Sequence, residues 1–127
     1  MTRVRVLIEP ERLDPERLRE MLDADGCGSV VSFVGLTRGE DDGVTVERLE
    51  FDAWEGGLPR VLNELAEQAL GQFGVSSVVL AHRTGSVGAG EPIVCIHVGS
   101  AHRAESFEAC SWLIDELKRQ APLWKKE

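Results

Sequence analysis

Two apolar segments on either side of a short glycine-rich stretch constrain the fold of this chain most. The segments are residues 75–83 and Pro92–Ser100, and the stretch between them covers residues 85–90. Short runs rich in Val and Ile that are bounded by glycines are typical of β-strands. A gap of this length is typical of a hairpin turn. The sequence therefore predicts two neighbouring antiparallel strands joined by a turn at residues 85–90.

Further strands and helices alternate along the rest of the chain. Residues 3–8 and 44–53 alternate polar and apolar side chains, as half-buried strands do, and Ser29–Leu36 is an apolar run typical of a buried strand. Residues 37–43 form a polar loop. Asp14 and Pro15 predict a helix start, because Asp caps a helix and Pro fits its first position. Two longer helices are expected where apolar residues recur at helical spacing: Leu58, Val61, Leu62, Leu65 and Ala69, then Cys110, Leu113, Ile114 and Leu117.

The predicted order β-α-β-β-α-β-β-α indicates an α+β fold, a mixed or antiparallel sheet covered by helices. The chain length of 127 residues predicts a single domain over residues 1–127. A net charge of −8 argues against binding to nucleic acids or to anionic membranes, since both attract surplus cations. We found no apolar run of membrane-spanning length and no signal-peptide pattern, so a cytoplasmic protein is expected. Three widely spaced cysteines favour reduced thiols, and the spacing predicts no metal site.

His102 and Arg103 stand where the last helix is expected to begin. The helix dipole is positive at this end, so two potential cations there oppose it unless an anion binds nearby. The pair is therefore a candidate anion site. The alternative is that Glu105 and Glu108, in the first turn of the same helix, neutralise the pair.

Three further cations are candidates for binding or catalysis. Lys118 borders the apolar stripe of the last helix, which predicts a partly desolvated amine, although a Lys there can also extend its head group into water. Lys125 follows Pro122 and Trp124 in a segment that could be a solvated tail or could be held in place by the Trp. Arg38 follows the apolar strand Ser29–Leu36 and stands among acids, so it is either a surface ion-pair partner or a binding residue.

The ordered motifs of the C-terminal half resemble those of the large, catalytic subunits of molybdopterin synthase. These motifs are His82-Arg-Thr-Gly85-Ser-Val-Gly-Ala-Gly90-Glu91, Ser100-Ala-His102-Arg103, Phe107-Glu108-Ala109, Asp115-Glu-Leu-Lys118 and Pro122-Leu-Trp124-Lys125-Lys126-Glu127. Weaker similarity occurs earlier, in Val30 to Gly35 followed by Thr37-Arg38, and in Leu49-Glu50-Phe51. The resemblance covers residues 3–127.

The resemblance implies an α/β-hammerhead-like fold and a homodimer that carries a small ubiquitin-like sulfur carrier at each end. The carrier's C-terminal Gly-Gly, as a thiocarboxylate, would supply sulfur to cyclic pyranopterin monophosphate and yield the dithiolene of molybdopterin for molybdenum cofactor biosynthesis. Lys118 and Lys125 match the family's active-site lysines. Arg38, His102 and Arg103 match residues of its pterin-phosphate pocket, with the His-Arg pair reaching in from the neighbouring protomer. No bound cofactor is implied, because the carrier brings the sulfur.

The chain departs from the family pattern at its end and in residues 52–58. Many members continue past Lys-Lys-Glu, and residues 52–58 replace a Tyr/His-rich stretch that ends in Met. No ubiquitin-like domain is fused to the chain, so a separate carrier is expected. One alternative function is a non-catalytic dimeric module that binds a phosphorylated small molecule through Arg38, His102 and Arg103. Another is an enzyme that forms a Schiff base through Lys118.

Overall fold

Four strands form the larger of the sheets in the structure, which is a computed structural model describing residues 3–38, 40–41, 44–45, 48–52, 58–120 and 124–126. The strand order is β1-β6-β8-β2. β1 pairs with β6 in parallel, and the other two pairings are antiparallel, so the sheet is mixed, as predicted. The strands are β1 (Val4–Glu9), β2 (Ser29–Leu36), β6 (Ser77–Arg83) and β8 (Pro92–Ser100).

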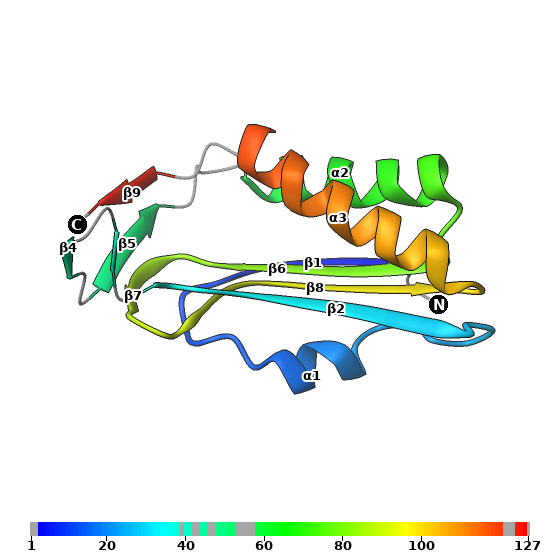
Figure 1. Cartoon of the computed structure of the whole chain (residues 1–127), viewed down its shortest axis with the longest axis horizontal. Coiled ribbons are helices and arrows are strands. Elements are labelled where there is room, and N and C mark those ends of the chain that lie inside the picture. The colour runs from blue at the N-terminus through cyan, green and yellow to red at the C-terminus, as the bar shows by residue number, and fades with distance from the viewer. Residues whose placement is uncertain are drawn as a thin grey trace.

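Helices cover both faces of this sheet. The long helices α2 (Leu58–Phe73) and α3 (Arg103–Gln120) lie on one face, and the short α1 (Pro15–Glu20) lies on the other (Figure 1). The larger core lies under α2 and α3 and includes Leu62, Leu80, Ile96 and Leu113, which are all fully buried. A smaller core joins α1 to the sheet through Leu18, Val79 and Cys95, among others.

The helix boundaries follow the local sequence signals. The Asp14 side chain accepts a hydrogen bond from the Arg17 amide at 3.2 Å, and Pro15 occupies the first helical position of α1. α2 ends at Phe73, and Gly74 adopts a φ of 69°, the left-handed conformation that a side chain would disfavour. The predicted helix starts and the α+β class are therefore confirmed.

A second, smaller sheet lies beyond one end of the larger one (Figure 1). Its order is β7-β5-β9, formed by β5 (Arg48–Asp52), β7 (Gly85–Gly88) and β9 (Trp124–Lys126). The prediction of a plain hairpin turn at residues 85–90 is wrong, because residues 85–88 pair with β5 and form a strand. The possible solvated tail around Lys125 is likewise a strand, β9, paired with β5.

Two other expectations between residues 37 and 53 need correction. The predicted loop 37–43 contains β3 (Glu40–Asp41), which pairs with β4 (Val44–Thr45). The single strand expected over residues 44–53 is represented by β4 and β5, and residues 46–47 and 53 lie outside the described part of the chain. Glycines and alternating side chains in the sequence do not specify which short segments find a pairing partner.

β2 was expected to be buried, but it is one of the two outer strands of the larger sheet. Val34 retains 36% and Leu36 retains 55% of its accessible surface, and both belong to the alternate set of β2 residues that includes Ser32. An apolar run predicts a strand but does not specify whether the strand lies at the centre or at the edge of a sheet. The burial of β2 was therefore predicted wrongly from its composition alone. Among the described residues, no helix is both long enough and apolar enough to cross a bilayer.

Candidate functional site

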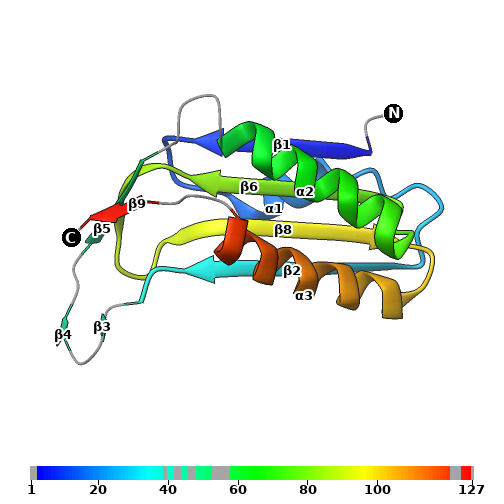
Figure 2. The same ribbon diagram turned by 90° about the horizontal axis from the view of Figure 1, so that it is seen from above.

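The predicted cations lie at four places in the fold. His102 and Arg103 stand at the start of α3, Lys118 lies in its last turn, Arg38 follows β2, and Lys125 belongs to β9. Figure 2 shows the last turn of α3 on the side of the molecule that carries the smaller sheet, and the beginning of α3 toward the opposite end. The two ends of α3 therefore face different parts of the molecule.

The start of α3 is fixed to the start of β2 by serine contacts. The hydroxyls of Ser29 and Ser106 lie 2.8 Å apart, and the Gly28 amide donates to the Ser100 carbonyl at 2.9 Å. A Cβ on Gly28 would lie 2.4 Å from the Ala101 carbonyl oxygen, so only glycine permits this approach. The backbone on both sides of His102 is thus held firmly.

His102 and Arg103 are both exposed on this anchored turn. Within residues 58–120, which the structure describes without a gap, no ion pair joins either of them to Glu105 or Glu108. Glu105 places one carboxylate oxygen, Oε2, in a buried position without a hydrogen-bond partner among the described groups. Neither glutamate forms a close ion pair with His102 or Arg103 in the single chain, and both side chains are exposed to an anion from outside.

Lys118 is exposed in the last turn of α3, whereas Leu117 before it is buried. The partly desolvated amine predicted from the sequence is therefore wrong for the single chain. The apolar stripe buries residues on one side of the helix, and Lys118 lies just past its border. Beside it, Arg119 Nη1 contacts Glu116 Oε1 at 3.1 Å. An exposed lysine at this end of a helix is free to meet an anionic partner brought by another molecule.

Arg38 is exposed, and backbone hydrogen bonds of the buried residue before it, Thr37, fix its main-chain position. The Thr37 amide donates to the Glu91 carbonyl at 3.0 Å, and the Gly90 amide donates to the Thr37 carbonyl at 2.7 Å. In the smaller sheet, Lys125 stands opposite Phe51 of β5. The backbone of Lys125 is thereby placed, while its side chain lies outside the described part of the structure.

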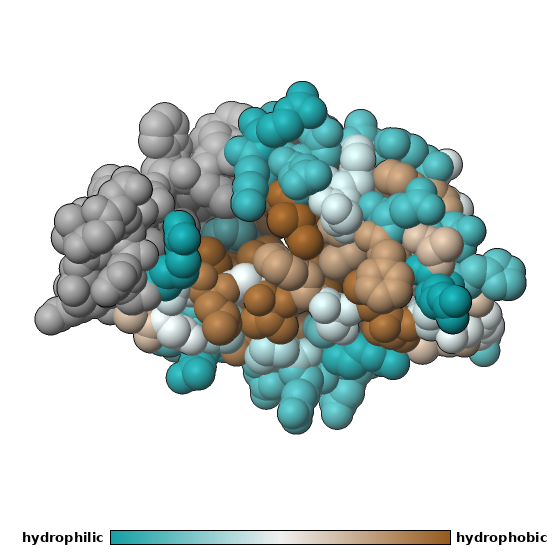
Figure 3. Space-filling view, viewed as in Figure 1, coloured by the Kyte–Doolittle hydropathy of each residue, from teal (hydrophilic) through white to brown (hydrophobic). Residues whose placement is uncertain are grey.

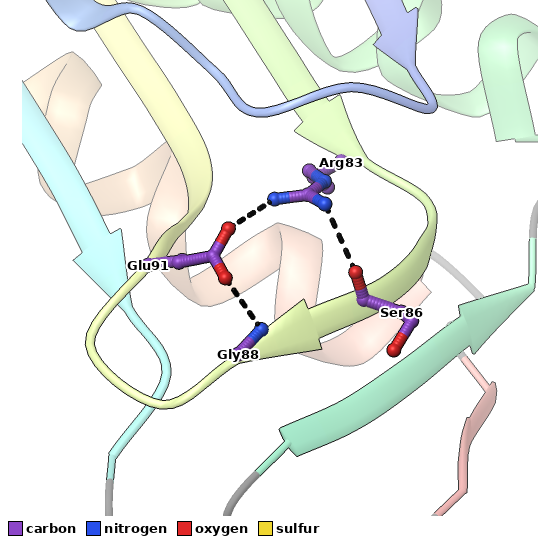
Figure 4. Close-up of polar contacts among 4 residues, drawn as sticks. All are labelled: Arg83, Ser86, Gly88 and Glu91. Carbon is purple, nitrogen blue, oxygen red and sulfur yellow. Dashed lines mark hydrogen bonds and ion pairs between the residues drawn. The ribbon is translucent and has the colours of Figure 1, made fainter.

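An ion pair that sequence reasoning missed lies between β6 and β8. Arg83 Nη1 contacts Glu91 Oε1 at 2.7 Å, Glu91 Oε2 accepts from the Gly88 amide at 2.9 Å, and Arg83 Nη2 donates to the Ser86 carbonyl at 2.9 Å (Figure 4). The hydrogen bond from Arg83, and then that from Gly88, lowers the pKa of Glu91. The sequence signal that could have predicted this ion pair is the presence of opposite charges on either side of a glycine-rich segment.

Other reactive groups do not gather into a further cluster in the described residues. Burial raises the pKa of both Cys95 and Cys110 to about 11, so these thiols stay protonated and unreactive near neutral pH. No group of three or more His, Cys, Asp or Glu side chains in the described ranges could hold a metal ion. A shallow hollow is lined by Arg3, Asp23, Asp25, Gly74, Val75 and Ser76, and by none of the predicted site residues.

The length of α3 decides which cations one chain can bring together. An α-helix rises 1.5 Å per residue, so fifteen residues separate Arg103 from Lys118 by about 22 Å. A single small substrate cannot contact both ends of such a helix. Within one chain, His102 and Arg103 therefore lie too far along α3 from Lys118 to share one small ligand with it.

Comparisons with known proteins identify the family and the fold of the chain. The family described as MoaE protein matches residues 8–120. The molybdopterin synthase catalytic subunit of Pyrococcus abyssi is 31% identical over 126 residues, which cover 99% of this chain and 85% of the relative. That of Caulobacter vibrioides is 41% identical over 100 residues, which cover 79% of this chain and 65% of the relative.

Solved structures show the same fold. Molybdopterin synthase from Staphylococcus aureus superposes with a TM-score of 0.87 at 29% identity, covering 100% of this chain and 91% of that one. A complex of subunits 1 and 2 of molybdopterin-converting factor from Helicobacter pylori gives a TM-score of 0.79 at 27% identity, covering 94% and 82%. From the family match and from relatives at this identity and coverage, we conclude that the chain belongs to the MoaE family of molybdopterin synthase catalytic subunits.

Proposed function

We propose that this chain transfers sulfur from the C-terminal thiocarboxylate of a small ubiquitin-like carrier to cyclic pyranopterin monophosphate, forming molybdopterin. The observation that carries the proposal is the similarity to molybdopterin synthase catalytic subunits over 99% of the chain. The exposed cations at both ends of α3 and after β2 support it, since both reactants are anions. Without cations, two anions would repel each other in attacking geometry.

Lys118 and Lys125 are assigned to the sulfur-transfer step. After the sulfur has bonded to the pterin, water adds to the carrier's terminal carbonyl and forms a negatively charged tetrahedral species, which a lysine ammonium within hydrogen-bond reach stabilises. Collapse of this species breaks the carbon–sulfur bond, leaving the sulfur on the pterin and the carrier as a carboxylate. The exposure of Lys118 in the single chain supports a role toward a partner that arrives with its own flexible tail. The proposal needs no resident cofactor or metal, because the carrier supplies the sulfur.

Arg38, His102 and Arg103 are assigned to the pterin phosphate. His102 and Arg103 stand at a helix N-terminus, where the helix dipole and free amides add to their attraction for an anion. Because about 22 Å of helix separates Arg103 from Lys118, a complete site needs both residues from different chains. We therefore propose a homodimer in which His102 and Arg103 of one protomer complete the site that contains Lys118 of the other.

The outer edge of β2 is the proposed contact between protomers. Val34 and Leu36 on β2 and Phe107 on α3 are exposed large apolar side chains, and Phe107 retains 60% of its accessible surface. Figure 3 shows apolar side chains gathered on the face where α3 and β2 lie. A two-fold axis beside β2 and perpendicular to α3 would reverse the direction of the partner's α3, which would move its first turn toward the Lys118 end of the first protomer.

The sulfur carrier is proposed to be a separate small subunit. The Helicobacter pylori structure is a complex of two subunits of molybdopterin-converting factor, which supports a two-protein enzyme. All three cysteines of this chain are free, which supports a reducing compartment, and we place the reaction in the cytoplasm.

A reconstituted reaction tests the proposed function. The purified chain is mixed with its thiocarboxylated carrier and cyclic pyranopterin monophosphate, and the dithiolene product is followed by mass spectrometry. The wild type should form product, and Lys118→Ala should form none while still binding the carrier. Absence of product with a stable wild-type carrier complex would favour the alternative, a module that binds a phosphorylated small molecule. Turnover by Lys118→Ala at the wild-type rate would remove the lysine from the chemistry.

A further inference from the structure

Glu91, at the turn into β8, holds two separate segments through its side chain. One carboxylate oxygen contacts Arg83 at the end of β6, and the other accepts from the Gly88 amide in β7. Arg83 in turn donates to the Ser86 carbonyl, so the ion pair fixes β7 at both ends (Figure 4). The Arg83 and Glu91 side chains retain only 11% and 29% of their accessible surface. We call these two residues the β6–β8 clasp.

The main chain of Glu91 holds a third segment. Its carbonyl accepts from the Thr37 amide at 3.0 Å, and the neighbouring Gly90 amide donates to the Thr37 carbonyl at 2.7 Å. Thr37 is 3% exposed and directly precedes Arg38. The main-chain position of Arg38 therefore depends on Glu91, the same residue whose side chain holds β7.

The smaller sheet extends this connection to Lys125. Gly88 and Ser86 of β7 stand opposite Arg48 and Glu50 of β5, and β5 pairs in turn with β9. A shift of β7 relative to β8 would move β5 and β9 with it, because strands in one sheet share backbone hydrogen bonds. The clasp thus lies at the junction between the Arg38 segment and the strand that carries Lys125.

We propose that the Arg83–Glu91 clasp is a positioning unit that sets the relative placement of Arg38 and Lys125 without touching either reactant. This inference rests on the proposed function, in which those two cations act on one substrate complex. A misplacement of about 1 Å at a reacting centre can lower a rate by roughly a hundredfold, so a small displacement of the smaller sheet has a large effect.

The charge of Glu91 matters to the clasp as well as its shape. Both of its oxygens accept hydrogen bonds, one from a guanidinium and one from a backbone amide. In Glu91→Gln one acceptor becomes an NH2 group, which faces a donor and cannot accept from it. The substitution therefore breaks one arm of the clasp while keeping the size of the side chain.

Arg3→Gln provides a matched control. Arg3 Nε also donates to a backbone carbonyl, that of Ser76 at 2.9 Å, but at the other end of β6 from Arg83. Each variant loses one hydrogen bond of a charged side chain near an end of β6 in the larger sheet. Only Glu91→Gln disturbs the junction with the smaller sheet.

The test compares the wild type, Glu91→Gln and Arg3→Gln in complex with the thiocarboxylated carrier. Steady-state kinetics with cyclic pyranopterin monophosphate should give Glu91→Gln a kcat lowered roughly tenfold to a hundredfold with little change in KM, and Arg3→Gln a kcat near that of the wild type. Hydrogen exchange should accelerate in residues 48–52 and 85–88 of Glu91→Gln alone.

Two results would overturn the positioning role. One is a kcat for Glu91→Gln equal to that of the wild type or of Arg3→Gln. The other is a lowered kcat with unchanged exchange in the smaller sheet. If the wild type itself makes no product, the proposed function fails and the positioning role of the clasp in that reaction fails with it. The exchange comparison then still reports whether the clasp holds the smaller sheet, so the two failures are distinguishable.

Discussion

Ser32 Oγ and His97 Nδ1 lie 2.7 Å apart and join the outer strand β2 to β8. The other ring nitrogen, Nε2, contacts the Pro15 carbonyl at 3.1 Å. A carbonyl only accepts, so Nε2 carries the proton and Nδ1 accepts from the Ser32 hydroxyl. His97 is 2% exposed, and this neutral ring connects the sheet to α1.

We predict that acid weakens the fold through His97. Burial lowers the pKa of His97 below its ordinary value of 6.5, so the unfolded chain binds the proton more readily than the folded one. The free energy of unfolding should therefore fall as the pH decreases below about 6.5, where the unfolded chain takes up the proton before the folded one does. Chemical unfolding between pH 7.5 and pH 5 measures this slope, within roughly the range in which histidines titrate.

His97→Gln and His102→Gln separate this effect from other titrations. The glutamine at position 97 offers one donor and one acceptor without titrating, and its slope should be shallower than that of the wild type. His102→Gln, at an exposed position, is the matched control for replacing a histidine by glutamine. Equal slopes in all three proteins would show that His97 does not control acid stability. His82, also buried with a lowered pKa, accounts for part of any remaining slope.

We predict that two inactive variants restore activity when combined. Lys118→Ala and Arg103→Ala each damage every site of their own homodimer. A mixed dimer contains one intact site, so random exchange of protomers should recover about a quarter of wild-type activity. The assay measures product after the two variants are unfolded and refolded together.

The double variant Lys118→Ala/Arg103→Ala serves as the control for this mixture. Refolded with Lys118→Ala, it creates no intact site and should recover nothing. Activity of the mixed single variants that stays at the level of the separate proteins would place both residues in the same protomer's site.

We predict that Leu36→Asp gives a monomer. Leu36 is 55% exposed on β2, so the aspartate costs the isolated chain little, about 0.5 kcal/mol or less. At a contact between protomers the same carboxylate would lose its water. Size-exclusion chromatography with light scattering measures the mass. Glu67→Lys, on the exposed side of α2, is the charge-changing control and should remain a dimer. A dimer of Leu36→Asp would move the contact away from β2.

We predict opposite effects from two Gly→Ala substitutions. A Cβ on Gly88 would lie 2.4 Å from Glu91 Oε2, so alanine there must displace the carboxylate from the clasp. Gly71 in α2 has nothing within 4 Å of that position. Thermal unfolding should show a Tm lowered by about 4 °C or more for Gly88→Ala, and raised for Gly71→Ala because alanine favours a helix by roughly 0.5–1 kcal/mol. A Tm of Gly88→Ala at or above that of the wild type would contradict the tight packing of the clasp.

Local signals in the sequence predicted local structure well. Asp14 and Pro15 begin α1, as predicted, because helix capping depends on neighbouring residues alone. The pairing of Gly85–Gly88 with β5 was missed, since it depends on a segment far away in the chain. The outer position of β2 was missed for the same reason.

The candidate site was predictable in its residue types but only partly in its geometry. The position of His102 and Arg103 at the start of α3 followed from the helical pattern. The exposure of Lys118 did not follow from the pattern, because a lysine at the border of an apolar stripe can be either buried or exposed. Arg83 and Glu91 stand eight residues apart, and only the fold shows that they meet.

The strand order of the larger sheet also determines when this protein can fold during synthesis. β1 and β2 occupy the two margins, and each pairs with a central strand, β6 or β8, that the ribosome makes later. When synthesis has reached the end of α2, β1 and β2 have therefore been made, but the central strands with which they pair have not. Unpaired strands are prone to aggregate, so this strand order leaves the first half of the chain exposed to aggregation until residues 77–100 emerge.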